Sequence, residues 1–136
     1  LDEALATLRA NNAELDALEA AIGTSAVLKV FSGSPPATCA TADSGTVLAT
    51  ISLPSDWMAA ASAGVKAKSG TWQDSSADAN GTAGHFRIYA SDGTTCHMQG
   101  TVTATGGGGD MVVDSTSFTA GQSFTVATFQ LTAGNA

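Results

Sequence analysis

Basic residues are scarce in this chain. Lys and Arg together number 5 of 136 residues, against 12 Asp and Glu, and the formal net charge is −7. The five basic residues never cluster, so the sequence has no positively charged stripe of the kind that follows a phosphate backbone. We therefore expect no nucleic-acid partner.

Long apolar runs are missing as well. No run approaches the ~20 residues that a helix needs to span a bilayer, and no basic segment followed by an apolar core opens the chain. We expect no membrane insertion. Because the chain begins with Leu1 rather than Met, we expect either that a leader was removed or that further residues precede Leu1.

Cysteine is almost absent. Cys39 and Cys96 are too few for a disulfide scaffold and too far apart for a CxxC motif. Two thiols are the first interpretation, and a disulfide between Cys39 and Cys96 is the second. Its loop of roughly 57 residues would contribute at most about 4 kcal/mol in the chain-entropy model. Metal binding by this pair with His85 or His97 is the third interpretation.

Signatures of catalysis and ligand binding are also missing. There is no Gly-x-Ser-x-Gly elbow, and the glycine run at residues 106–109 lacks the Lys-Ser or Lys-Thr of a phosphate-binding loop, so we predict a flexible hairpin tip there. The stretch from Asp74 to Asp78 lacks the Gly and Glu of a calcium loop. His85 and His97 lack a third ligand and are predicted to be surface residues. We expect no enzymatic activity, no cofactor and no metal.

The first 22 residues carry a regular apolar stripe. Leu or Ile recurs every seven residues, and a second set follows three positions after the first, which is the a/d pattern of a coiled coil. The seam positions are Leu1, Ala4, Leu8, Asn11, Leu15, Leu18 and Ile22. We predict a domain of residues 1–23 in which a helix ends at Gly23 and self-associates, with a trimer favoured. The alternative is an amphipathic helix that folds back on its own domain.

Residues 24–136 form the second domain, rich in Gly, Ser, Thr, Ala and Val. The Asp-Gly step within residues 91–93 predicts a tight hairpin, and residues 55–63 predict a short helical turn. Strands are predicted at residues 27–31, 46–53, 65–72, 85–90, 94–103, 111–114 and 123–131. This pattern indicates a mainly β fold, an antiparallel β-sandwich (jelly-roll-like) preceded by the coiled-coil helix, with a small barrel as the alternative.

Three large aromatic residues allow two interpretations. Trp57, Trp72 and Tyr89 are expected to pack in the core, because a domain with few large side chains needs them inside. Alternatively, Trp72 and Tyr89, with the loop at residues 74–81, contact a glycan through ring stacking.

Six segments of the second domain share a recognisable pattern. They are KVFSG at residues 29–33, PP at 35–36, GTVLA at 45–49, ANGTAGHFR at 79–87, QGTV at 99–102 and SFTV at 123–126. In these segments the chain resembles a family of small structural proteins of tailed bacteriophages. The resemblance covers nearly all of residues 27–132, but neither the leading helix nor the two cysteines.

The resemblance implies an assembly component of a virion head, neck or tail, and it transfers no catalytic residue. We therefore expect a non-enzymatic virion structural protein, either a capsid, neck or tail decoration or a short fibre. It would oligomerise through its N-terminal helix and contact other virion proteins in the phage particle. The alternative is a receptor- or glycan-binding adhesin module that contacts a host surface glycan.

Overall fold

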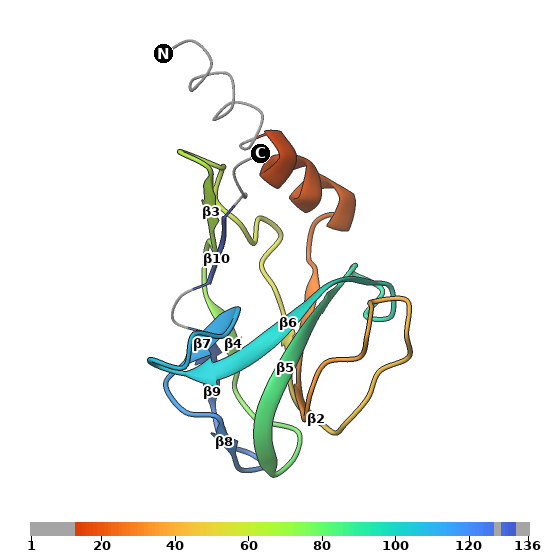
Figure 1. Cartoon of the computed structure of the whole chain (residues 1–136), viewed down its shortest axis with the longest axis vertical. Helices are drawn as coiled ribbons and strands as arrows, with labels where there is room; N and C mark the ends of the chain where they lie inside the picture. Colours follow the sequence, from red (N-terminus) through yellow and green to blue (C-terminus); the bar gives the residue numbers. More distant parts are fainter. Residues whose placement is uncertain (1–12, 127–128, 133–136) are drawn as a thin grey trace.

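The computed structural model describes residues 13–126 and 129–132 and is mainly β. Its larger sheet has the strand order β2-β1-β5-β6-β7, with β8 paired to β5 (Figure 1). All neighbours in it are antiparallel except β6 and β7, which are parallel. The strands are β1 (Val27–Ser32), β2 (Val47–Ser52), β5 (Gly81–Tyr89), β6 (Cys96–Ala104), β7 (Met111–Val113) and β8 (Ser117–Phe118). The sheets are thus mixed and antiparallel.

Two short antiparallel pairs form separate two-stranded sheets. These are β3 (Val65–Ala67) with β10 (Gln130–Thr132) and β4 (Trp72–Asp74) with β9 (Phe124–Val126). The Lys68 amide donates a hydrogen bond to the Phe129 carbonyl at 2.9 Å. This bond links the segment between β3 and β4 to the segment between β9 and β10. The two long strands predicted at residues 65–72 and 123–131 are therefore each divided.

The core is organised around a run of aromatic rings. Phe86 of β5 packs edge-on against Phe129 at 5.5 Å between ring centroids, Phe129 contacts Trp72 at 5.5 Å, and Trp72 contacts Trp57 at 6.0 Å. All four are buried, which confirms core packing for both tryptophans. Trp57 lies in a segment without the predicted helical turn, joined instead by the isolated bridge Met58↔Lys68.

The hairpin predicted at residues 91–93 is present between β5 and β6. The Asp92 carboxylate accepts hydrogen bonds from the Thr94 and Thr95 amides and from the Thr95 hydroxyl, at 2.8, 2.9 and 2.6 Å. These bonds, the Thr95 hydroxyl first, hold the pKa of Asp92 well below its usual value. Gly93 adopts a φ of 71°, which glycine tolerates without strain.

The glycine run at residues 106–109 is a compact return loop rather than the predicted flexible hairpin tip. It connects β6 to β7, which are parallel neighbours and would ordinarily need a much longer connection. The Gly109 amide bonds the Thr103 hydroxyl at 2.9 Å, and a Cβ on Gly107 or Gly109 would lie 2.6 or 2.8 Å from Thr103. Only residues without a side chain let the loop pack this closely.

The described part of the N-terminal helix, residues 13–22, lies against the β domain (Figure 1). It ends at Gly23 as predicted, with a φ of 91° and a bond from the Gly23 amide to the Glu19 carbonyl. Leu15 and Ile22 are buried, and Leu18 packs against the core. Within the described residues, no helix is long and apolar enough to cross a membrane.

A buried lysine ties the helix to β3. The Lys66 ammonium lies 2.6 Å from a carboxylate oxygen of Asp16 and 2.7 Å from one of Glu19, and its side chain is 1% exposed. Burial lowers the pKa of Lys66, but the two carboxylates outweigh it and raise the pKa above its usual value. The same bond from Lys66, with one from the Ala61 amide, lowers the pKa of Asp16.

The coiled-coil prediction must therefore be corrected where the structure describes it. Leu18 and Ile22 pack on their own domain because the β core offers them an apolar surface next to the Lys66 ion pairs, and Leu15 is buried as well. The fold-back alternative holds for Leu18 and Ile22. The other four seam residues lie outside the described residues; they are Leu1, Ala4, Leu8 and Asn11.

We predict that Ile22→Ala destabilises the protein by about 2–5 kcal/mol, since it removes a buried side chain and leaves a cavity. Ala20→Ser, on an exposed position of the same helix, should change stability by less than about 0.5 kcal/mol. Urea unfolding followed by tryptophan fluorescence measures both. Equal, small effects would show that the helix does not dock.

Candidate functional site

The two residues predicted to contact a glycan are inaccessible. Trp72 is 0% exposed and Tyr89 is 1% exposed, so neither ring offers a face to a sugar. Trp72, in β4, belongs to the aromatic core. Tyr89, in β5, lies on the face of the larger sheet that is turned away from this core, beneath the loop of residues 33–46. The glycan-contact prediction for these two residues is therefore wrong.

The two histidines do not meet. His85 pairs with Thr101, whereas His97 falls at the irregularity between β5 and β6 and is exposed. His85 is buried, contrary to expectation: its ring stacks on Phe31 at 4.9 Å, and its Nδ1 lies 2.9 Å from the Gly33 carbonyl oxygen. Its Nε2 has no hydrogen-bond partner among the described residues.

The acids of the loop at residues 74–81 bind the edge of β2. The Asp74 carboxylate accepts a bond from the Thr50 amide at 3.0 Å, and the Asp78 carboxylate accepts one from the Thr50 hydroxyl at 2.8 Å. In residues 13–126 and 129–132, no group of three or more His, Cys, Asp or Glu side chains is arranged to hold a metal ion. The two carboxylates therefore take up hydrogen-bond donors at the outer edge of β2, which has no neighbouring strand on that side in the part of the chain that the structure describes.

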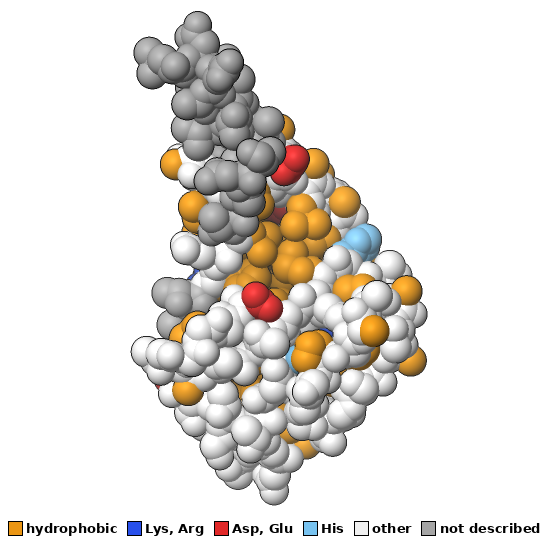
Figure 2. All heavy atoms as spheres, viewed as in Figure 1, with side chains coloured by type: hydrophobic (Ala, Val, Ile, Leu, Met, Phe, Trp, Pro, Cys, Tyr) orange, Lys and Arg blue, Asp and Glu red, His pale blue; other side chains and the backbone are white. Residues whose placement is uncertain are grey.

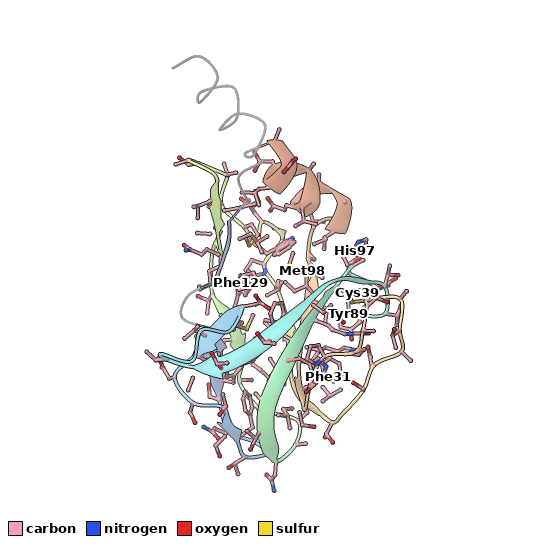
Figure 3. The ribbon with its side chains drawn as sticks, in the orientation of Figure 1. Phe31, Cys39, Tyr89, His97, Met98 and Phe129 are labelled. Carbon is pink, nitrogen blue, oxygen red and sulfur yellow. A yellow bond between two sulfur atoms is a disulfide. The ribbon has the colours of Figure 1, made fainter. Side chains whose placement is uncertain are left out.

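The two cysteines form a disulfide, so the preferred interpretation of two thiols is wrong. Cys39 lies in the loop of residues 33–46 and Cys96 at the start of β6, with Cα atoms 5.3 Å apart. Figure 3 shows Cys39 beside Tyr89, on the side of the sheet away from Phe129. Sequence spacing could not decide this because only the fold brings positions 57 apart together.

Arg87 is the centre of the polar cluster that holds this loop. Its guanidinium is buried and donates to the Asp43 carboxylate at 2.7 Å, to the carbonyls of Thr38 and Thr41 at 3.0 and 2.9 Å, and to the Gln99 side-chain carbonyl at 3.1 Å. A buried guanidinium needs such partners, since it stays charged in proteins. We call Arg87, Asp43, Tyr89 and Gln99 the loop anchor.

Tyr89 completes the loop anchor. Its hydroxyl donates to the Asp43 carboxylate at 2.6 Å, and the Lys29 ammonium lies 4.8 Å from its ring centroid. Burial, with the neighbouring Asp43 charge, raises the pKa of Tyr89 far above its usual value. Burial raises the pKa of Asp43 as well, but the bonds from Tyr89 and Arg87 outweigh it, so the pKa of Asp43 lies below its usual value.

Two further contacts seat the loop. The Gln99 amide donates to the Pro36 carbonyl at 2.6 Å. At Gly84 the loop backbone comes so close that a Cβ would meet the Gly33 carbonyl oxygen. Sequence reasoning missed the loop anchor. The available signal was the alternation in β5, where Arg87 stands between the apolar residues Phe86 and Ile88.

A groove of about 400 Å³, lined by both polar and apolar side chains, opens on the other side of β6. Hydrophobic side chains gather on this face of the molecule (Figure 2), and Met98 and Phe129 lie there (Figure 3). The strand that borders β6 on this side, β7, pairs with it only from Val102 onward. The groove is lined by Phe86, Met98, Gln99, Asp110, Phe129, Gln130 and Leu131.

Comparisons with known proteins identify no relative. No protein-family model, curated protein or solved structure matches the chain.

We predict that Tyr89, the only tyrosine of the chain, does not ionise near pH 10 while the protein is folded. Because its pKa is raised in the folded state, its contribution to stability is complete below pH ~10 and is lost as the pH rises above that value. Absorbance at the phenolate band against pH measures ionisation, and Tyr89→Phe supplies the baseline. Ionisation near pH 10 in a folded chain would contradict the buried hydroxyl.

Proposed function

We propose that the chain is a non-enzymatic virion structural protein, a head, neck or tail decoration or a short fibre. In this proposal the larger sheet and the β3, β4, β9 and β10 layer are the two layers of a jelly-roll-like sandwich. The observation that carries the proposal is the loop anchor, which fixes a 14-residue surface loop, residues 33–46, to the sheet by a buried charge and a disulfide. A surface fixed in this way suits recognition by shape.

The positions that carry the family resemblance support a structural role. Several of them hold the loop rather than line an opening: Phe31 stacks on His85, Gly84 admits the loop backbone, and Arg87 bonds Gln99. Contacts that hold a loop in place, rather than line an opening, suit a protein that presents a fixed surface to a partner. The low charge of the β domain also suits close packing against other virion proteins.

Oligomerisation is the second part of the proposal. Since Leu18 and Ile22 pack on their own domain and Leu15 is buried, a seam between copies must use the earlier heptad positions. We propose that the pattern of residues 1–12 joins three copies. Three weak attachment surfaces on one trimer bind a particle far more tightly than one, because the second and third contacts become intramolecular.

We predict a trimer for the full chain in sedimentation-velocity ultracentrifugation and a folded monomer after deletion of residues 1–12. Deletion of residues 1–22 is a poor test, because it would also expose the core beneath Ile22. Leu8→Asp is the matched point variant, and Asp2→Ala, outside the seam, is the control. A monomer for the full chain would exclude this mode of assembly.

The virion role has a direct test that does not depend on oligomer number. An antibody against the purified chain should label phage particles produced from the genome that encodes it, at one site on the head, neck or tail, in immunoelectron microscopy. Particles that carry no label, with the chain found only in the unassembled fraction of the same lysate, would overturn the proposal.

A further inference from the structure

Arg87 of the loop anchor binds the backbone on both sides of Cys39. Cys39 lies between Thr38 and Thr41, and the carbonyls of both accept hydrogen bonds from the same Arg87 nitrogen, Nη2, at 3.0 and 2.9 Å. Asp43, a little further along the loop, accepts a bond from the other terminal nitrogen at 2.7 Å. The backbone on each side of Cys39 is thus held by one buried side chain.

The other cysteine is held by the same group. Cys96 pairs with Tyr89 at the hairpin end of β6, and Gln99, three residues later, accepts a bond from Arg87 Nε at 3.1 Å. Gln99 also donates to the Pro36 carbonyl at 2.6 Å, on the loop side. None of these bonds uses a sulfur atom. They place the two Cα atoms 5.3 Å apart, within the range that a disulfide requires.

We propose that Arg87 is a positioning residue for the Cys39–Cys96 disulfide. The loop docks on the sheet while both cysteines are thiols, and oxidation afterwards fixes a loop that is already in place. The disulfide is therefore a redox-controlled fastening added to a folded surface, rather than a precondition of folding.

The oxidation step needs an oxidant, for which a small disulfide such as oxidised glutathione suffices. One cysteine thiolate attacks a glutathione sulfur, which breaks the glutathione disulfide and releases one glutathione thiolate. The second cysteine then attacks the mixed disulfide, forms the Cys39–Cys96 bond and releases the second glutathione. Two electrons pass to glutathione, and the two thiol protons go to solvent or to the released thiolates. Both cysteines are partly exposed, so the reagent can reach them.

If the chain has the proposed virion role, on which only this consequence rests, docking of the loop before disulfide formation suits assembly. A chain that folds without its disulfide can assemble in a reducing cytoplasm, and the loop is fastened after the particle reaches an oxidising exterior. The measurements below use the isolated chain, so they succeed or fail independently of the virion role.

The test is the redox equilibrium of the purified full chain. The chain is equilibrated in glutathione buffers of graded ratio, thiols are trapped by alkylation, and mass spectrometry gives the effective concentration of one cysteine for the other. Because coupling between docking and disulfide formation is reciprocal, Arg87→Met should lower this concentration by about 10- to 100-fold. Arg87→Lys should recover little of it, since one ammonium cannot bond both carbonyls and Gln99 in the same geometry.

Two variants keep the test decisive. Gln99→Ala, which removes the bond to Pro36, should lower the effective concentration in the same direction, and it decides the matter if Arg87→Met does not fold. Thr50→Val, which removes a bond to Asp78 at the β2 edge, should leave it unchanged. If the folded loop-anchor variants match the unsubstituted chain, the positioning role is wrong.

A second measurement examines the reduced state itself. With both thiols reduced, or in the double variant Cys39→Ser and Cys96→Ser, Tyr89 should stay un-ionised near pH 10 as in the oxidised chain, because Asp43 still holds its hydroxyl. Ionisation of Tyr89 near pH 10 in a reduced but folded chain would show that the loop leaves the sheet without its disulfide, and would overturn the proposed order.

Discussion

The buried guanidinium of Arg87 is the constraint on which one whole side of the domain depends. Arg cannot shed its charge at any accessible pH, so its burial must be offset by fixed acceptors. Four such acceptors surround it, and three of them, Asp43 and the carbonyls of Thr38 and Thr41, come from the loop. An undocked loop would leave that charge without these partners, and the loop therefore belongs to the folded structure as firmly as a strand does.

This constraint divides the larger sheet into two faces of different chemistry. On one face, Phe86 and Ile88 enter a core of aliphatic and aromatic side chains that tolerates exchanges of similar volume. On the other, His85, Arg87 and Tyr89 are as deeply buried, but each has a polar atom hydrogen-bonded to the loop. Substitution there breaks a network whose members depend on one another, and its cost is not additive.

The sequence predicted the locally determined parts of this fold well. Gly23 ends the helix, and Asp92 with Gly93 forms the hairpin turn, because each acts through its own backbone or that of close neighbours. Burial of His85, the disulfide and the loop anchor depended on residues tens of positions apart, and no local pattern encodes such distances. The division of the strand predicted at residues 65–72 also depends on distant residues, since its two parts, β3 and β4, pair with different strands, β10 and β9.

The leucine stripe shows how one pattern can satisfy two structures. An a/d spacing places Leu15, Leu18 and Ile22 on one face of a helix, and either a partner helix or the β core can cover that face. Docking on the same chain loses no translational freedom, whereas joining separate copies costs about 4 kcal/mol or more. The charges also favour docking, because Lys66 meets Asp16 and Glu19 beside the stripe and a homomeric seam would have to separate those pairs. The described end of the stripe is therefore used within the chain, because docking on the β core costs less than joining copies.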